Sequence, residues 1–306
     1  MDAFSEIGVF VRVVEARSFT RAATAVGLTT SGVSRVIGRL EARLGVRLLD
    51  RTTRSLGLTA DGAAYHERCV RILRDLEDAD GALARSRGAP RGRLRVDAPT
   101  VLGRFVVGPS MRRFLDLHHE LSVDLSVRDH LIDPIAEGVD VVLRMAELRE
   151  SEMVHKRLGE VRFLLVASPA YLARRGRPGS LADLRKHDLM GFLSGSTPIP
   201  WRFRSHGRDL TFSPSARLNT NSVDALREAA LGGHGLTQLT EMHVRDDLAR
   251  GALEVVLGED EQHVVPIHAL FTRDKASLPK VRVFLDFLEE RLGRRRGGRS
   301  RSTTRG

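Results

Sequence analysis

Apolar residues in the first 60 positions follow the spacing of short amphipathic helices. The pattern predicts one helix over residues 4–16, a second over 19–26 and a third that begins at Thr29 or Thr30. Gly27 separates the second helix from the third, because glycine can end a helix in the left-handed conformation without steric cost. The third helix is expected to bury a stripe of residues at three- and four-residue spacing: Val33, Val36, Ile37 and Leu40.

The opposite face of the third helix carries short hydrogen-bonding side chains and guanidinium groups, namely Thr30, Ser31, Ser34, Arg35 and Arg39. Such groups read base edges and hold phosphates when a helix enters the major groove of DNA. The segment from Arg12 to Arg54 is also basic, with nine arginines against three acidic residues. The alternative is an ordinary helical hairpin with a solvated polar face. The small alanines before the glycine turn and the arginine repeat after it together favour a helix-turn-helix.

Threonine and leucine alternate between residues 52 and 59, which predicts a short two-stranded ribbon, or wing. Arg51 and Arg54 fall near its tip, where a guanidinium can lie along phosphates or enter a minor groove. A plain surface hairpin with solvated arginines is the alternative.

One long helix without proline is expected from Gly62 to Arg87. Six of its residues form a heptad seam with spacings of 4, 3, 4, 3 and 4: Tyr65, Cys69, Ile72, Leu76, Ala79 and Leu83. The seam favours pairing with the same helix of a second copy, and the alternative is a helix that lies on its own domain. In the seam Cys69 is expected to act as a small buried hydrophobe rather than a reactive thiol. The glycine- and proline-containing run 85–93 predicts a hinge.

After the hinge the pattern changes to strands that alternate with helices. Strands are expected at 94–98, 123–127, 139–143, 162–168, 201–204, 210–219, 235–239 and 266–271. Helices are expected at 107–118, 131–137, near 170 and 181, and at 222–231, 241–250 and 279–291. This alternation predicts mainly parallel sheets covered by helices, arranged as two α/β lobes with a cleft between them.

Composition and charge narrow the class of protein. The 306 residues are 42% hydrophobic and 29% charged, with a formal net charge of +10. Much of that charge lies in a tail, 293–306, which cannot form a core and is expected to be disordered. The single cysteine excludes an internal disulfide. No apolar run approaches the roughly 20 residues that span a bilayer, and the start does not resemble an export signal, so a cytoplasmic protein without a membrane partner is expected.

Motifs of common catalytic sites do not occur in the chain: there is no Gly-x-Ser-x-Gly elbow, Gly-x-Gly-x-x-Gly fingerprint or phosphate loop. The scattered histidines lack metal-ligand spacing, so no enzyme, metal site or cofactor is expected. A small-solute-binding protein without a DNA role is the rival function that two lobes alone would permit. The absence of an export signal and the helix-turn-helix pattern argue against it.

Together these segments resemble the LysR-type transcriptional regulators of bacteria. The stretches that carry the resemblance are Phe10–Ala23, Val33–Arg35, Leu40–Leu49, Arg51–Arg54 and Leu58–Gly62, with looser likeness as far as residue 292. The resemblance implies a winged helix-turn-helix, a linker helix that forms a dimer, and two α/β lobes like those of periplasmic binding proteins. It also implies a homotetramer that binds double-stranded promoter DNA and responds to a small organic effector.

The expected domains are a DNA-binding domain at 1–60, a linker and hinge at 61–90, an effector domain at 91–292 and the tail at 293–306. By the resemblance, Thr30, Ser31, Ser34, Arg35 and Arg54 contact DNA; the full expected set adds Ser18, Thr29, Arg39 and Arg51. Two positions depart from the family pattern. Thr30 replaces a usual glutamine and cannot make its bidentate contact to adenine. Gly32 replaces alanine or proline and lowers helix stability by up to about 1 kcal/mol.

The resemblance places the effector at strand ends in the cleft, and the residues there suit a small organic anion, with Arg144 as its cation. An interlobe or surface salt bridge is the alternative for Arg144. Trp201, the single tryptophan, is expected either to line the cleft or to pack in the second lobe, and Asn221 or Ser222 either to bind the effector or to cap a helix. The complete expected set is Thr100, Val101, Leu102, Arg144, Trp201, Asn221 and Ser222.

Overall fold

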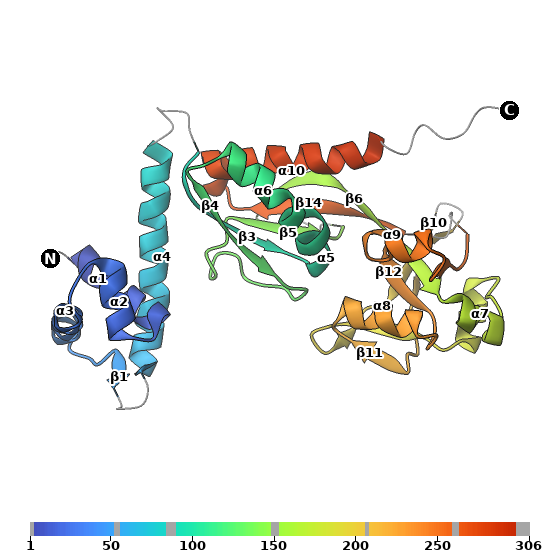
Figure 1. Cartoon of the computed structure of the whole chain (residues 1–306), viewed down its shortest axis with the longest axis horizontal. Helices are drawn as coiled ribbons and strands as arrows, with labels where there is room; N and C mark the ends of the chain where they lie inside the picture. The colour runs from blue at the N-terminus through green and yellow to red at the C-terminus, as the bar shows by residue number, and fades with distance from the viewer. Residues whose placement is uncertain are drawn as a thin grey trace. The chain divides into compact units, whose positions relative to one another are not determined.

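A computed structural model of the chain describes residues 3–51, 56–83, 90–147, 153–205, 208–258 and 263–297 (Figure 1). The chain divides into two compact units, Met1–Arg87 and Gly88–Gly306. None of the helices in these described ranges is long and apolar enough to cross a membrane.

The first unit consists of three short helices, a two-stranded ribbon and one long helix. Its elements are α1 (Ala3–Ala16), α2 (Phe19–Val26), α3 (Thr30–Leu44), β1 (Leu49–Arg51), β2 (Leu56–Leu58) and α4 (Ala60–Leu83). Gly27 ends α2 and Gly45 ends α3, both in the left-handed region at φ of 68° and 73°. Helices α2 and α3 with the turn at Gly27 form the predicted helix-turn-helix. Strands β1 and β2 pair antiparallel and form the predicted wing.

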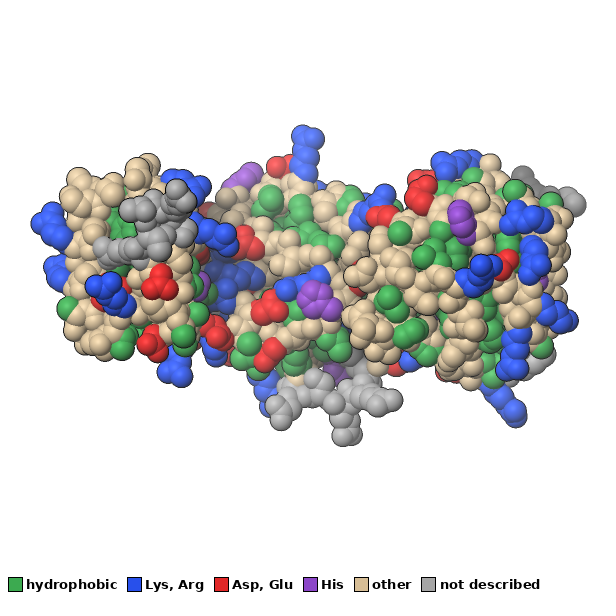
Figure 2. Space-filling view, turned by 90° about the horizontal axis from the view of Figure 1, so that it is seen from below, with side chains coloured by type: hydrophobic (Ala, Val, Ile, Leu, Met, Phe, Trp, Pro, Cys, Tyr) green, Lys and Arg blue, Asp and Glu red, His purple; other side chains and the backbone are tan. Residues whose placement is uncertain are grey.

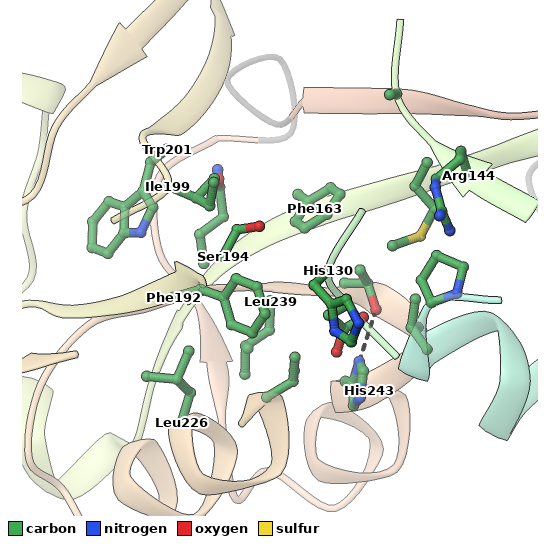
Figure 3. Close-up of a pocket in the computed structure, with 18 of the residues that line it drawn as sticks. His130, Arg144, Phe163, Phe192, Ser194, Ile199, Trp201, Leu226, Leu239 and His243 are labelled. Atoms are coloured by element: carbon green, nitrogen blue, oxygen red, sulfur yellow. Dashed lines mark hydrogen bonds between the residues drawn. The ribbon is translucent and has the colours of Figure 1, made fainter. Parts of the chain in front are cut away.

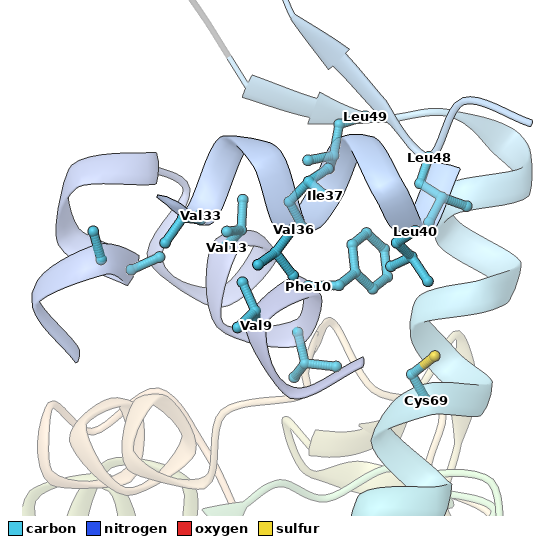
Figure 4. Close-up of a cluster of buried hydrophobic side chains, with 13 residues drawn as sticks. Val9, Phe10, Val13, Val33, Val36, Ile37, Leu40, Leu48, Leu49 and Cys69 are labelled. Carbon is cyan, nitrogen blue, oxygen red and sulfur yellow. The ribbon is translucent and has the colours of Figure 1, made fainter. Parts of the chain in front are cut away.

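The core of this unit forms where α1, α3 and α4 meet (Figure 4). The four residues of the predicted α3 stripe are all buried. Phe10 on α1 is fully buried beside them, and its ring packs 5.7 Å from that of Tyr65 on α4. Cys69 is also fully buried in this cluster, and burial raises the pKa of its thiol. The prediction that Cys69 is a small buried hydrophobe is confirmed.

Two close contacts tie the wing to the helices. The Glu41 carboxylate at the end of α3 accepts hydrogen bonds from the backbone N–H groups of Leu48 and Leu49, at 2.9 and 3.1 Å. A Cβ at Gly62 would lie 1.9 Å from the Leu48 carbonyl oxygen, so only glycine allows α4 to cross the wing at this distance. The Thr59 hydroxyl accepts from the Gly62 N–H at 2.9 Å and so caps α4.

The second unit has two α/β lobes. The first contains β3 (Gly92–Ala98), α5 (Thr100–Leu102), a π-helical turn (Gly103–Val107), α6 (Gly108–Leu117), β4 (Leu121–Val127), β5 (Val141–Met145), a 3₁₀ turn (Lys275–Ser277) and α10 (Pro279–Gly297). The second contains α7 (Pro169–Arg175), a 3₁₀ turn (Leu181–Lys186), β7 (Met190–Ser194), β8 (Thr197–Pro198), β9 (Trp201–Ser205), β10 (Arg208–Phe212), β11 (Leu218–Thr220), α8 (Val223–Leu231), β12 (Thr237–Thr240), α9 (Glu241–Ala249) and β13 (Glu254–Val255).

Two long strands, β6 (Val154–Ala167) and β14 (His263–Phe271), connect the lobes. They lie in one sheet of order β12-β6-β14-β5-β3-β4, with β13 also paired to β6 (Figure 1). The prediction of mainly parallel sheets is wrong for this part of the sheet: β14 runs antiparallel to both β5 and β6, whereas β3 is parallel to β4 and β5. The chain leaves the first lobe along β6 and returns along β14, so these two strands have to run in opposite directions.

Most of the helices and strands expected in the second unit are present, but β6 begins at Val154 rather than at residue 162, and β7, β8 and β13 were not predicted. Two further expected elements have a different structure. Residues 131–137 form turns rather than a helix, because Asp133 accepts from the backbone N–H groups of Ile135 and Ala136 and so offers the backbone an alternative to helical bonding. The single strand expected at 210–219 is two strands, β10 and β11, in different sheets. The predicted hinge lies largely outside the described residues, and the predicted tail lies outside them from residue 298.

Candidate functional site

The start of α3 is held by a side-chain cap. The Thr29 hydroxyl accepts from the Gly32 N–H at 3.0 Å and lies 3.2 Å from the Ser31 hydroxyl. Of the two threonines considered, Thr29 is therefore the cap. Ser18 has the same task at α2, accepting from the Arg21 N–H at 3.3 Å. Capping by itself explains both hydroxyls, since it satisfies backbone donors that the helix leaves unpaired.

The remaining predicted contacts on α3 lie on the face opposite its buried stripe. Thr30, Ser31, Arg35 and Arg39 are exposed, and Ser34 is half-buried. A groove on this helix is lined by the small residues Gly32, Gly38 and Ala42 together with the two arginines. In Figure 2 basic side chains project from several points on the surface of this unit. Arg54 lies outside the described residues, as does the side chain of Arg51.

The heptad seam on α4 divides into two parts. Cys69 is buried against the core of its own unit, and Tyr65 packs on that core too. One and two turns further on, Ile72 and Leu76 have 44% and 45% of their surfaces exposed. The first part of the seam therefore packs within the chain, as the alternative interpretation held, and the middle part presents apolar surface outward.

A cavity of about 310 Å³ lies between the two lobes of the second unit (Figure 3). Trp201 from the second lobe and Arg144 from the first lie at opposite ends of it. Apolar side chains dominate its walls: Val101, Leu131, Met145, Phe163, Phe192, Ile199, Trp201, Leu226 and Leu239. Its polar lining residues include Arg128, Asp129, His130, Arg144, Ser194, Gln238, Thr240 and His243.

Three of the residues predicted for the effector site line this cavity: Val101, Arg144 and Trp201. Trp201 fulfils both alternatives considered for it, because its ring also stacks on Phe212 at 5.7 Å inside the second lobe.

The other four predicted effector residues lie outside the lining. Leu102 is in the core of the first lobe. The Thr100 backbone N–H donates to Asp129 at 2.9 Å. Asn221 is exposed, and Ser222 caps α8 by accepting from the Ala225 N–H at 3.2 Å.

Arg144 has an ionic partner. Its guanidinium donates to one oxygen of the fully buried Asp97 at 3.0 Å, and that of Arg128 donates to the other at 2.5 Å. Arg128 also pairs with Glu137, and hydrogen bonds to Asp97 raise the pKa of Arg128 above its usual value. Asp97 on β3, Arg128 after β4 and Arg144 on β5 meet because these three strands are adjacent and parallel.

His243, from α9, is a lining residue that the sequence did not single out. Its Nδ1 lies 3.1 Å from the Thr240 hydroxyl, and its ring meets Phe105 edge-on at 5.0 Å. Burial lowers the pKa of His243 to about 4, so its ring is neutral at physiological pH. The walls from Phe163, Phe192 and Leu239 were also missed, because apolar strand residues look alike in sequence whether they line a cavity or fill a core.

No group of three or more His, Cys, Asp or Glu side chains in the described ranges is arranged to hold a metal ion.

Two protein families match the chain. Residues 4–63 match the bacterial regulatory helix-turn-helix protein, lysR family, and residues 87–293 match the LysR substrate binding domain. The chain belongs to the LysR family of transcriptional regulators. It is thus a DNA-binding regulator with an effector-binding domain and not an enzyme, and the match to the helix-turn-helix family removes the alternative of a solute-binding protein without a DNA role.

Relatives of this LysR-type regulator match it over nearly their full length. It is 37% identical to the HTH-type transcriptional regulator CrgA of Neisseria meningitidis over 292 residues, 94% of this chain and 96% of CrgA. It is 31% identical to the HTH-type transcriptional activator AaeR of Escherichia coli, over 95% of this chain and 94% of AaeR.

Solved structures of full-length regulators share its fold. That of CrgA aligns with a TM-score of 0.60 at 35% identity, covering 96% of this chain and 99% of CrgA. That of AphB, a virulence activator of Vibrio cholerae, aligns with a TM-score of 0.60 at 26% identity, covering 94% and 98%. Regulators of this family bind promoter DNA and small-molecule effectors and form oligomers.

Proposed function

We propose that this LysR-type regulator reads its promoter with the outward face of α3. The observation that carries this proposal is that the buried stripe of α3 leaves Thr30, Ser31, Arg35 and Arg39 exposed on one side. Hydroxyls there contact base edges, and the arginines contact base edges or phosphates. Ser34 and the wing residues Arg51 and Arg54 extend the same contact set. Ser18 and Thr29 contribute by fixing the helix starts, from where their backbone N–H groups approach phosphates.

Thr30 offers the sharpest test, because a glutamine there makes a bidentate contact to adenine that threonine cannot make. The operator preference of the full-length protein is determined by selection from random DNA, for the wild type and for Thr30→Gln. We expect one base pair in each half-site to change toward adenine. Thr24→Gln, at an exposed position on α2, is the control and should leave the preference unchanged. Identical preferences for wild type and Thr30→Gln would remove position 30 from the reading face.

The effector of this regulator binds, in our proposal, in the cavity between the lobes of residues 91–292. Its volume and its mainly apolar walls with a few convergent polar groups are typical of a small-molecule site. Val101, Arg144 and Trp201 belong to that site, and His243, Thr240 and Gln238 join them. Effector binding alters promoter binding because it favours one arrangement of the lobes over another.

Filling the cavity tests this assignment. Ser194→Phe places a ring where the effector would lie and should abolish the transcriptional response to the native inducer while basal promoter binding persists. Ser215→Phe, at an exposed position in the same lobe, is the matched control and should respond normally. A normal response from Ser194→Phe would place the effector elsewhere.

We further propose that two copies pair through the exposed part of the α4 seam and that two such dimers form a tetramer on DNA. Ile72 and Leu76 supply the apolar surface for the first contact.

A further inference from the structure

The cations in the effector cavity are already neutralised by carboxylates of the same chain. Arg144 and Arg128 each donate to one oxygen of Asp97, and Arg128 pairs with Glu137 as well. Two guanidiniums thus face two carboxylates, and the four formal charges sum to zero. Asp129, a further lining residue, adds a negative charge. Among the described lining residues no lysine or additional arginine offsets it.

Asp97 is held firmly in this role. It is fully buried at the end of β3, and both of its oxygens are occupied by the two arginines. Arg144 uses the same terminal nitrogen to donate to the Leu143 carbonyl at 3.0 Å, which fixes its guanidinium beside β5. A ligand carboxylate near Arg144 would therefore meet a guanidinium whose charge Asp97 already offsets, and would itself lie close to the Asp97 carboxylate.

The rest of the cavity also provides no positive charge. His243 is neutral, and its Nδ1 is already engaged with the Thr240 hydroxyl. The Gln238 amide is engaged with the backbone of Arg202, accepting from its N–H at 3.2 Å and donating to its carbonyl at 2.7 Å. A carboxylate that entered would lose its hydration without gaining a cation, whereas a neutral polar group would lose far less.

We propose that the cavity selects an uncharged, largely apolar molecule of about the size of one substituted ring, and that Asp97 is the residue that excludes carboxylates. This inference rests on the proposed effector site and replaces the expectation of an organic anion, which treated Arg144 as an unpaired cation. The ring of the ligand packs against Trp201, Phe192 and Leu226 in the second lobe. Its neutral polar group faces Arg144, whose charge Asp97 offsets, at the other end.

Wild-type protein tests the inference without any substitution. Trp201 is the single tryptophan and lines the cavity, so its fluorescence reports occupancy. The full-length protein is titrated at pH 7.5 with pairs that differ in charge but little in shape: benzamide and benzoate, then phenylacetamide and phenylacetate. We expect each amide to bind at least about tenfold more tightly than its carboxylate, since tenfold corresponds to the loss of one charged-group interaction.

Asp97→Asn frees both arginines while it keeps the side-chain volume. In this variant benzoate binding should strengthen by about tenfold or more, with benzamide binding changed by less than about threefold. Asp124→Asn is the matched control, because Asp124 is an exposed aspartate on the neighbouring strand that pairs with Arg93 at 3.1 Å. It should leave both affinities unchanged. Thermal unfolding shows whether each variant is folded, and the amide and carboxylate pairs titrated against the wild type test the charge selection independently of Asp97→Asn.

The outcomes separate this inference from the proposal on which it rests. Carboxylates that bind the wild type as tightly as the amides, or more tightly, would overturn the charge selection and leave the effector site standing. If no member of either pair changes Trp201 fluorescence in any variant, the cavity does not accept small aromatic molecules. Both the proposed effector site and its preference for uncharged ligands would then be wrong.

Discussion

Thr29, the cap before α3, and Arg35, in the second turn of α3, act on different partners. Thr29 turns its hydroxyl back onto the helix, where it caps the Gly32 N–H. Arg35 is exposed on the face opposite Val33, Val36 and Ile37, away from the buried stripe of α3. A substitution at Arg35 should therefore change DNA binding and not stability.

Replacing Arg35 with alanine should weaken specific promoter binding by about 1–3 kcal/mol, because one guanidinium contact to a base or phosphate is lost. Fluorescence anisotropy with the cognate promoter measures the effect, and thermal unfolding verifies an unchanged fold. Arg12→Ala is the matched control: Arg12 is an exposed arginine on α1 that pairs with Glu15 at 2.9 Å. Equal affinities for Arg35→Ala and the wild type would contradict the assignment.

The buried side chain of His243 makes the stability of the folded protein depend on pH. Its pKa falls from 6.5 to about 4 because burial penalises the charged ring. In the unfolded chain the same ring takes up a proton near pH 6.5. The unfolded state therefore binds more protons between pH 6.5 and about 4, and stability falls as the pH falls through that window.

His243→Gln should remove part of this pH dependence. The wild type should lose up to about 3 kcal/mol more stability than the variant between pH 7 and pH 4, from a shift of about 2.5 pKa units at about 1.36 kcal/mol each. Urea unfolding followed by Trp201 fluorescence gives the free energies for the second unit. His119→Gln, which replaces an exposed histidine, should keep the wild-type slope. If the free energy of unfolding falls equally with pH in wild type and His243→Gln, the folded state protonates His243 as readily as the unfolded state does.

At the scale of elements, α4 serves two purposes along one length. Its first turns complete the core of the winged helix, through Tyr65 and Cys69. Its middle turns leave Ile72 and Leu76 exposed at heptad spacing. A charge at Cys69 would therefore disrupt the fold, whereas a charge at Leu76 should act on association.

Leu76→Asp should produce a smaller species than the wild type in light scattering, because it buries an unpaired carboxylate in the proposed dimer contact. Promoter affinity should fall with it, since two joined domains bind paired half-sites better than one. Leu76→Met keeps the apolar surface and should behave as the wild type. If Leu76→Asp retains both mass and affinity, copies of this regulator associate through another surface.

At the scale of the effector unit, one short segment of the first lobe contacts both helices that flank the cavity in the second. Arg104, in the π-helical turn, forms a salt bridge with Asp224 on α8, and Phe105 beside it meets His243 on α9. A π-helical turn often marks a functional position in a helix. These contacts hold the lobes together next to the proposed effector site.

Asp224→Asn should raise the effector concentration for half-maximal response by up to about fivefold, because an exposed ion pair contributes about 0–1 kcal/mol to the closed arrangement. Exchanging the charges, Arg104→Asp with Asp224→Arg, should restore the response. Asp116→Asn removes an exposed ion-paired carboxylate within α6 alone and should have no effect. A reporter assay across inducer concentrations measures the concentration for half-maximal response. An unchanged value for Asp224→Asn would show that this salt bridge does not contribute to the effector response.

Local periodicity determined much of this fold. The α3 stripe, the glycine between α2 and α3, and most helices and strands of the second unit follow from spacing and turn chemistry, because these patterns act over a few neighbouring residues. The outward face of α3 follows as well, since a helix that buries one stripe has to expose the other. The N-terminal sequence also carried the family resemblance, which the matches to residues 4–63 and 87–293 confirm.

Tertiary structure alone decided the direction of β14, the division of the α4 seam and the make-up of the cavity. Strand direction depends on how the chain crosses between lobes, which spacing does not encode. Cys69 and Leu76 occupy equivalent heptad positions, and only packing against α1 distinguishes the buried residue from the exposed one. Asp97, Arg128 and Arg144 are separated by 31 and 16 residues in sequence, yet adjacent parallel strands bring their charges together. Whether a charge is free or neutralised depends on such long-range neighbours, so the sequence alone could not reveal it.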